Sequence, residues 1–236
     1  KGYWLVVQLL RFKNNLVAAL AAKISEPESS LAAGLVVGEK QALGKEWNER
    51  FRAVGLSHIV VLSGYNLSVV AENILRLTGL FLSQRLSLGT GAVAIILFAI
   101  MVGGGATVLR ASIMALIALL ARVTGRSYEA TRALFIAGVL MLLWNPKILV
   151  FDLGFQLSFM ALLGLVYLLP VLNKIFKAKD PGFWNWKKNS LTTISAQLAV
   201  VPFLLGNFGI FSLTSLFANI LILSAIPLTM GLGFLM

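Results

Sequence analysis

The chain contains no cysteine and only one histidine among its 236 residues. Without cysteine there is no disulfide framework, thiol nucleophile or thiolate metal site, and one histidine cannot form a histidine-based metal cluster. Charged residues are also scarce: they make up 12% of the chain, about half of their usual share in soluble globular domains. The sequence therefore excludes a metallohydrolase and a soluble globular protein, and we expect no metal and no cofactor.

Apolar residues make up 58% of the chain, and the mean hydropathy is +0.89. In lipid only helices and closed barrels satisfy every backbone group, and continuous apolar runs, instead of ten-residue alternation, exclude the barrel. We predict an all-α, polytopic transmembrane helix bundle of about seven spans. Largely apolar runs predicted as spans lie at 56–81, 87–104, 106–121, 133–145 and 148–172, of which 133–145 is short, with two more between 189 and 236 divided near Pro202, Gly206, Asn207 and Gly209.

Residues 1–54 are more polar and are predicted to form an amphipathic, interfacial border segment before a transmembrane domain at 55–236. The segment 4–22 is interrupted by polar residues and is predicted not to span the membrane. A helix is expected at 31–43, with Ser29 or Ser30 as its N-cap. After Gly44, a second amphipathic helix at 45–54 is expected to lie on the membrane surface.

The net charge is +11, from 20 basic and 9 acidic residues. This excess serves membrane orientation, anionic headgroups or a polyanionic cargo, and charge alone does not choose among them. Alternating spans place most basic loop residues on one face and only Lys147 on the other. That basic face, predicted to be cytoplasmic, carries Arg85, Arg122, Arg126, Arg132 and the five lysines between 174 and 188.

The stretch 55–73 is apolar but holds His58 and several other polar groups. On a helix, Ser63, Asn66 and Asn73 share one face at i, i+3 and i+10, whereas Glu72 points elsewhere. Two readings stay open: these side chains line a pathway, or they join neighbouring helices, the common role of small polar groups in lipid. Gly64 indicates a helix break or a close backbone approach.

Arg110 is the most informative single residue because it lies within an apolar span. A guanidinium at the centre of a span costs about 2.5–3.5 kcal/mol on the insertion scale, so it should face protein, water or an anion. Glu72 and Asp152 are its candidate ion-pair partners. The alternative is that Arg110 extends toward lipid headgroups from near Gly103–Gly105.

Asp152 and Gln156 lie one helical turn apart, and the Asp152 carboxylate is expected to cap a helix start. Ser212, Ser215 and Asn219 form a second polar stripe on the last span. Ser63 and His58 are close in sequence, which raises the alternative of a serine hydrolase. Five residues apart on a helix, they point about 140° away from each other, which disfavours a catalytic dyad.

Several of these segments together resemble the ComEC-type competence proteins. The stretch from His58 to Asn66 is similar to that family's Gly-x-x-His and Ser-Gly-Leu-His signature, with Tyr65 and Asn66 in place of Leu-His. The block 152–159 resembles the family's Asp-Pro-Gly-Phe-Gln-Leu-Ser-Phe, with Leu153 in place of proline. Two further blocks complete four in the family's order, one at 108–114 and one at 196–202 followed by 207–209 and 218–219.

The resemblance implies a channel domain that passes single-stranded DNA across the bacterial cytoplasmic membrane during natural transformation. The side chains expected along the DNA pathway are His58, Ser63, Asn66, Asn73, Arg110, Gln156, Gln197 and Asn219. Glu72, Asp152, Gly64 and Gly154 are expected to act structurally or in ion pairs. The alternative function is a secondary or lipid transporter for a small anionic solute, with Arg110 as its binding charge.

The expected partners are single-stranded DNA, the lipid bilayer and other DNA-uptake machinery, and the oligomeric state stays open. Members of this family also carry an oligonucleotide-binding-type domain and a metallo-β-lactamase-like domain on either side of the bundle. Neither is in this chain, which starts at Lys1 and ends inside an apolar run. We therefore expect a portion of a longer protein, without nuclease activity of its own.

Overall fold

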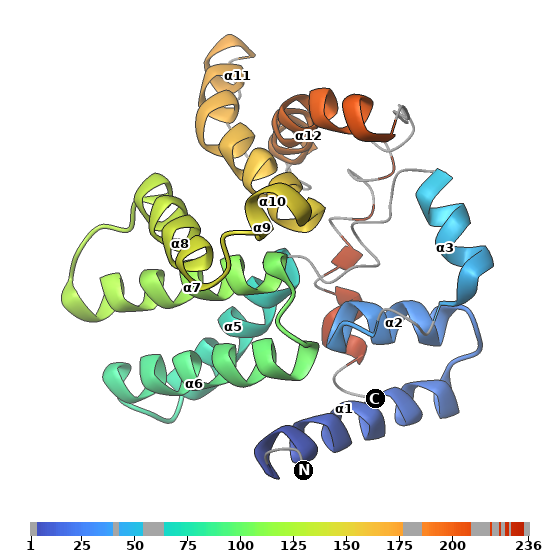
Figure 1. The fold of residues 1–236 in the computed structure, drawn as a ribbon. Coiled ribbons are helices and arrows are strands. Elements are labelled where there is room, and N and C mark those ends of the chain that lie inside the picture. The colour runs from blue at the N-terminus through green and yellow to red at the C-terminus, as the bar shows by residue number, and fades with distance from the viewer. Residues whose placement is uncertain are drawn as a thin grey trace.

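The structure is a computed structural model that describes residues 4–39, 43–53, 64–176, 186–208, 218, 222, 225–226 and 228–233. Across these residues the secondary structure consists of helices, with no β-strand (Figure 1). The predicted all-α class is confirmed. His58, Ser63 and Asn219 lie outside the described residues.

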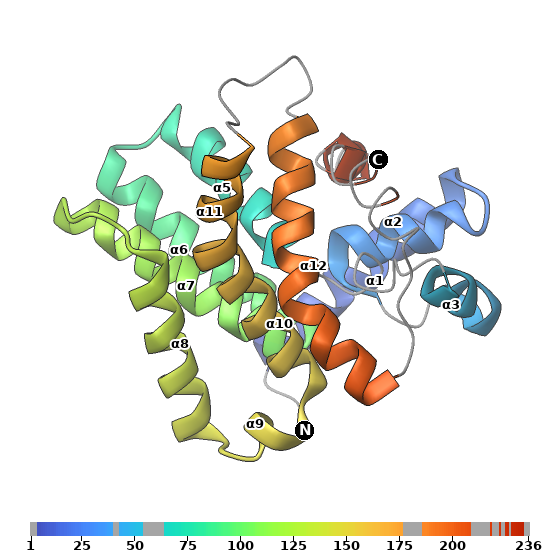
Figure 2. The same ribbon diagram turned by 90° about the horizontal axis from the view of Figure 1, so that it is seen from above.

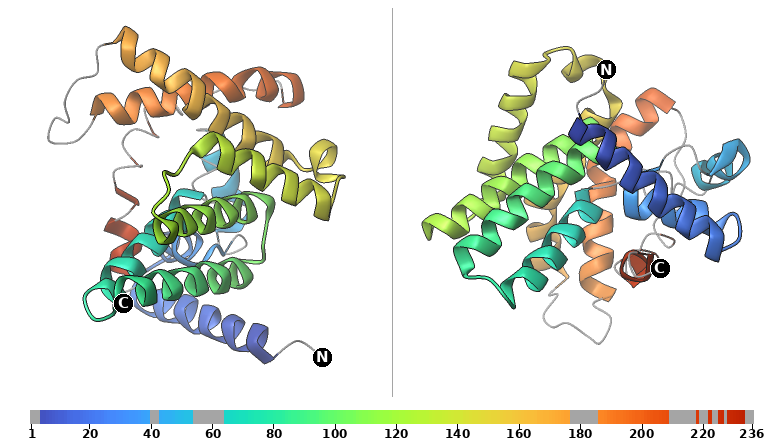
Figure 3. Two further views of the ribbon diagram at one scale, coloured as in Figure 1. Left: turned by 90° about the vertical axis from the view of Figure 1, so that its left-hand side faces the viewer. Right: turned by 90° about the horizontal axis from the view of Figure 1, so that it is seen from below.

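The N-terminal part contains α1 (Trp4–Lys23), α2 (Glu28–Val37) and α3 (Gly44–Ala53). Helix α1 lies at the outer edge of the molecule against α2 and α6 (Figures 1 and 3). It is 20 residues long and apolar enough to cross a membrane. The expectation that segment 4–22 is too polar to span is therefore not supported, because its few polar residues are diluted over five helical turns.

Helix α2 begins earlier than expected. Its N-cap is Pro27, without a side-chain capping bond, so the predicted cap by Ser29 or Ser30 is wrong. Both serines are instead buried within the first turn of the helix. The helix ends at Gly38, whose φ of +66° is in the left-handed region that glycine adopts without strain.

The central part is built from α5 (Gly64–Gly79), α6 (Gln84–Val102), α7 (Ala106–Thr124) and α8 (Ala130–Trp144). These agree within a few residues with the predicted spans at 87–104, 106–121 and 133–145. Helices α5, α6 and α7 share one hydrophobic core with the end of α2. Its buried members include Val36, Leu67, Ile95, Phe98, Val108 and Leu119. This core fixes the position of α7, which carries Arg110.

The predicted span at 148–172 is divided in the structure. A short helix, α9 (Ile148–Phe151), ends at Asp152, and α10 (Leu153–Leu163) follows directly. Helix α10 continues through a π-helical segment, η1 (Gly164–Leu168), into α11 (Leu169–Ile175). The wide turn precedes Pro170, which has no N–H to donate to the Val166 carbonyl four residues back.

Helix α12 (Trp186–Phe208) packs on α10, η1 and α11. It continues through Pro202 and ends at Phe208, within the stretch 202–209 where the division between the last two spans was expected. A proline inside a helix bends it without necessarily ending it, and α12 changes direction along its length in Figure 2. Gly164 of η1 lies so close to the backbone of Ser195 on α12 that no β carbon would fit there without movement.

Five described helical segments are long and apolar enough to span a membrane: α1, α6, α7, the run α10–α11, and α12. Helices α2 and α8 are apolar but shorter, which is compatible with about seven spans. Seen from above, the α5–α6 and α7–α8 connections and the end of α11 lie toward one end of the molecule, and the α8–α9 connection lies toward the other (Figure 2). Alternating spans predict this arrangement. The chain is a multi-pass membrane protein.

Candidate functional site

The candidate site is centred on Arg110, in the second turn of α7. Gly103 and Gly104 have φ angles of +91° and +62°, which turn the chain sharply after α6. Helix α7 starts immediately afterwards at Ala106. This turn places Arg110 near one end of its helix, on the side that faces α10.

The Arg110 side chain connects α7 to α10 through a hydroxyl group. Its Nε donates a hydrogen bond to Ser158 Oγ at 2.6 Å, and its Nη1 contacts Met114 Sδ at 3.6 Å. Ser158 is buried, and the guanidinium is partly buried. A neutral hydroxyl orients the guanidinium but does not cancel its charge.

Neither expected ion-pair partner neutralises Arg110. Glu72 pairs with Arg76 on its own helix at 3.6 Å, and both side chains are exposed. Asp152 Oδ1 accepts the backbone N–H of Phe155 at 2.8 Å and caps α10. Among the acidic residues that the structure describes, none lies within ion-pair distance of the Arg110 guanidinium. An anion would find an available positive charge here.

The start of α10 is built tightly against α7. The predicted cap by Asp152 is confirmed, and it explains why α10 begins one residue later. At Gly154 a β carbon would lie 3.1 Å from Asp152 Oδ1 and 3.9 Å from Thr107 Oγ1 of α7. Glycine at this position therefore lets the capping carboxylate fold back beside α7, one turn before Ser158 reaches Arg110.

Gln156 and Gln197 are both partly buried. The Gln156 side-chain amide donates to the carbonyl oxygens of Leu149 and Val150 at 2.7 and 3.1 Å. It therefore ties α9 to α10 across the break at Asp152. Gln197 lies on α12, which packs against α10.

The polar residues of α5 separate into two environments. Asn66 is 1% exposed, and its Nδ2 donates to the Leu35 carbonyl of α2 at 3.2 Å. This contact is a polar link between two helices, the second of the two readings of this face. Asn73 is exposed on the same helix, and Gly64 is the first residue of α5. The structure thus brings Arg110 close to α10 but places Asn66 against α2.

Sequence reasoning missed Ser158 and Met114 as contacts of Arg110. Ser158 lies in an otherwise apolar helix, and a buried hydroxyl in such a helix requires a hydrogen-bond partner. That signal was available in the block 152–159, but its partner on α7 was not. Within the described parts of the chain, no three histidine, aspartate or glutamate side chains gather to hold a metal ion.

A sequence profile of the family described as Competence protein matches residues 35–236. The chain belongs to the Competence protein family. It is 22% identical over 220 residues to "ComE operon protein 3" of Bacillus subtilis (strain 168), and the match covers 91% of this chain and 27% of that protein. The chain thus spans about a quarter of the length of this curated relative. No solved structure matches it significantly.

Proposed function

We propose that this competence-family chain is the membrane channel domain through which single-stranded DNA crosses the bacterial cytoplasmic membrane during natural transformation. The observation that carries the proposal is the Arg110 guanidinium, held within a membrane helix by Ser158 and without an acidic partner among the described residues. We infer DNA as the transported molecule from membership of the Competence protein family.

The charge of Arg110 suits a moving polyanion. A carboxylate partner would compete with each passing phosphate, whereas the Ser158 hydroxyl fixes the direction of the guanidinium and leaves its charge available. Phosphate contacts of this kind are independent of base sequence. We expect Arg110 to contact the backbone of the strand and not to select particular bases.

The candidate pathway residues differ in what they can contribute. Asn66 and Gln156 already donate hydrogen bonds to backbone carbonyls. They would therefore shape the walls more than contact the strand. His58, Ser63 and Asn219 remain proposed pathway residues, and the other partners, namely the flanking soluble domains and further uptake machinery, belong to the same proposal.

The test is DNA uptake in cells that carry Arg110→Ala in the full-length protein. We expect entry of labelled single strands, and transformation with it, to fall about ten- to hundredfold, because a charge-assisted hydrogen bond contributes about 1.5–3 kcal/mol. Arg110→Lys should keep part of the activity through its charge. Arg76→Ala removes an exposed arginine that is already paired with Glu72 and should leave uptake unchanged.

Membrane levels of each variant are compared by immunoblotting, and uptake is expressed per molecule. Normal uptake by Arg110→Ala would overturn the proposed role of this side chain. Loss of uptake of a small anionic solute, with DNA entry intact, would instead favour the transporter alternative.

A further inference from the structure

A second positively charged site lies where α7 ends and α8 begins. A cavity of about 240 Å³ is lined there by the last turns of α7, the connection after Gly125 and the first turns of α8. This volume is just below the range of about 300–1,000 Å³ that is typical of small-molecule sites. It is suited to a headgroup and the first carbons of a chain, and it is too small for a nucleic acid strand.

Part of the cavity lining is apolar. Ile117, Leu120 and Ile136 form this apolar wall. Leu120 and Ile136 are 62% and 43% exposed, and both lie on membrane-apolar helices. In a bilayer these side chains contact acyl chains, so the apolar wall faces the lipid hydrocarbon.

Another part of the cavity lining is basic. Arg126 and Arg132 line it together with one acidic residue, Glu129, which leaves a net charge of +1. Arg132 Nε is bonded to Glu129 Oε2 at 2.8 Å, so its remaining guanidinium N–H groups are available. The Arg126 side chain makes no hydrogen bond or ion pair within the described residues.

Tyr128 also lines the cavity. Burial raises the pKa of its phenol, an effect that outweighs the opposing influence of the Arg110 charge. The phenol therefore keeps its proton at neutral pH and can donate a hydrogen bond. Phosphate oxygens accept hydrogen bonds from guanidinium and hydroxyl groups.

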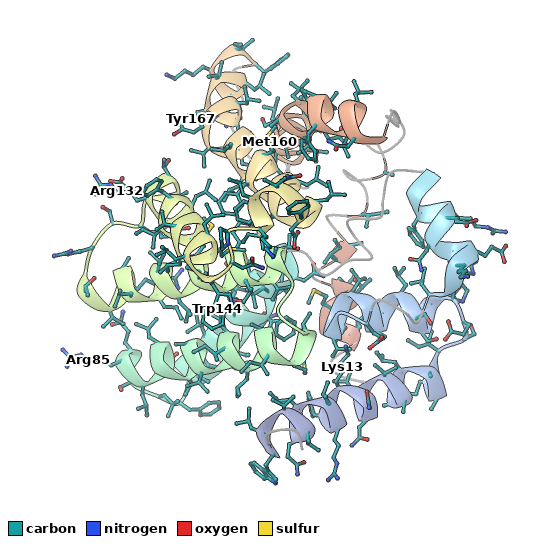
Figure 4. All side chains as sticks on the ribbon, viewed as in Figure 1. Lys13, Arg85, Arg132, Trp144, Met160 and Tyr167 are labelled. Atoms are coloured by element: carbon teal, nitrogen blue, oxygen red, sulfur yellow. The ribbon has the colours of Figure 1, made fainter. Side chains whose placement is uncertain are left out.

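The cavity lies at the end of the molecule that the distribution of basic residues assigns to the cytoplasm. Arg85 and Arg132 appear at the same edge in Figure 4. The cytoplasmic leaflet carries the anionic lipids, and basic pockets between membrane helices on this side bind their headgroups.

We propose that this cavity binds one anionic phospholipid of the cytoplasmic leaflet, with its phosphate on Arg126 and Arg132 and an acyl chain along Leu120 and Ile136. None of the proposed DNA-pathway residues lines the cavity. The inference is therefore independent of the proposed function. A lipid held here would join the ends of α7 and α8 and steady the helix that carries Arg110.

The test is native mass spectrometry of the purified chain in detergent, titrated with phosphatidylglycerol or with phosphatidylcholine of the same chain length. We expect one tightly retained phosphatidylglycerol. Each arginine near a membrane surface contributes about a fivefold increase in affinity for anionic lipid. Arg126→Gln should therefore weaken retention about fivefold, and Arg126→Gln with Arg132→Gln about 25-fold. The matched control is Arg85→Gln, at the same end but outside the cavity.

Three competitors identify the ligand. Phosphatidylcholine, inorganic phosphate and a short single-stranded oligonucleotide should each fail to displace the bound phosphatidylglycerol. Equal retention by the wild type and Arg126→Gln, or an equal loss in Arg85→Gln, would overturn the site. Displacement by inorganic phosphate would show a site for free anions, and displacement by the oligonucleotide would show a nucleic acid site. Displacement by phosphatidylcholine would show an unspecific lipid contact. Each of these results contradicts the proposal.

Discussion

Gly164 on the π-helical segment lies directly against Ser195 on α12. A β carbon at 164 would overlap the Ser195 carbonyl oxygen and would lie 2.7 Å from Ala199 Cβ. Ser195 is fully buried, and its hydroxyl turns back to the Leu191 carbonyl at 2.7 Å. Two backbones thus meet through small residues, the arrangement that holds helices together in lipid, where no hydrophobic force acts between them.

The first prediction follows from this contact. Gly164→Ala should destabilise the protein by about 1–3 kcal/mol, because a methyl group inserted into a closed contact forces the backbones apart. Gly89→Ala is the matched control, since a β carbon at that helix position meets no atom within 4 Å. It should be neutral or slightly stabilising. Thermal unfolding in detergent measures both variants, and equal melting temperatures would contradict the close packing.

The two asparagines of α5 provide the second prediction. Asn66→Ala should cost about 1–3 kcal/mol of stability, because the buried Leu35 carbonyl loses its donor. Asn73→Ala, on the exposed side of the same helix, should change stability by less than about 0.5 kcal/mol. Denaturation in mild detergent with added sodium dodecyl sulfate compares the two variants. Equal losses would show that burial does not distinguish these positions.

The third prediction concerns an ion pair between α1 and Glu39, two residues after the end of α2. Lys13 Nζ lies 2.9 Å from Glu39 Oε2, with the side chains 12% and 28% exposed. A double-mutant cycle to alanine should give a coupling energy of about 1–2 kcal/mol, because this pair is partly shielded from water. The exposed pair Arg50–Glu46 should give at most about 0.5 kcal/mol. A smaller coupling for Lys13–Glu39 than for Arg50–Glu46 would contradict this ranking.

The fourth prediction tests membrane orientation. Because the chain has no cysteine, single cysteines can be introduced without removing native ones. Cysteines at Ser83 and Ser127, in the α5–α6 and α7–α8 connections, should react with an impermeant thiol reagent from the cytoplasmic side only. A cysteine at Lys147 should react only from the opposite side. Labelling of all three from one side would disprove the proposed alternation of spans.

Local signals predicted much of the fold. Some signals act on neighbouring residues only. The glycines at 103 and 104 indicate where α6 ends and α7 begins, and the capping carboxylate of Asp152 indicates where α10 begins. The sequence also resembled the competence proteins, and the family match confirms this resemblance.

Contacts between distant residues were less predictable. From charge alone, Glu72 or Asp152 was predicted to pair with Arg110. In the structure Glu72 pairs with Arg76 on its own helix, and Asp152 accepts a backbone hydrogen bond from Phe155. Of the residues expected to divide the last apolar run, Pro202 lies inside α12, which packs on α10 and α11 and ends at Phe208. The cap at Asp152 was predicted, but the wide turn at Gly164–Leu168 was not, because a wide turn inside one apolar run does not change the hydropathy.

The π-helical segment also sets the rotational phase of everything that follows it. Each residue of an α-helix advances the chain by about 100°, and a π turn contains one residue more than an α turn. If the same residues were wound as a regular α-helix, α11, including Lys174, would be rotated by about 100° relative to α10. The wide turn of Gly164–Leu168 therefore determines the direction in which the Lys174 side chain leaves the helix.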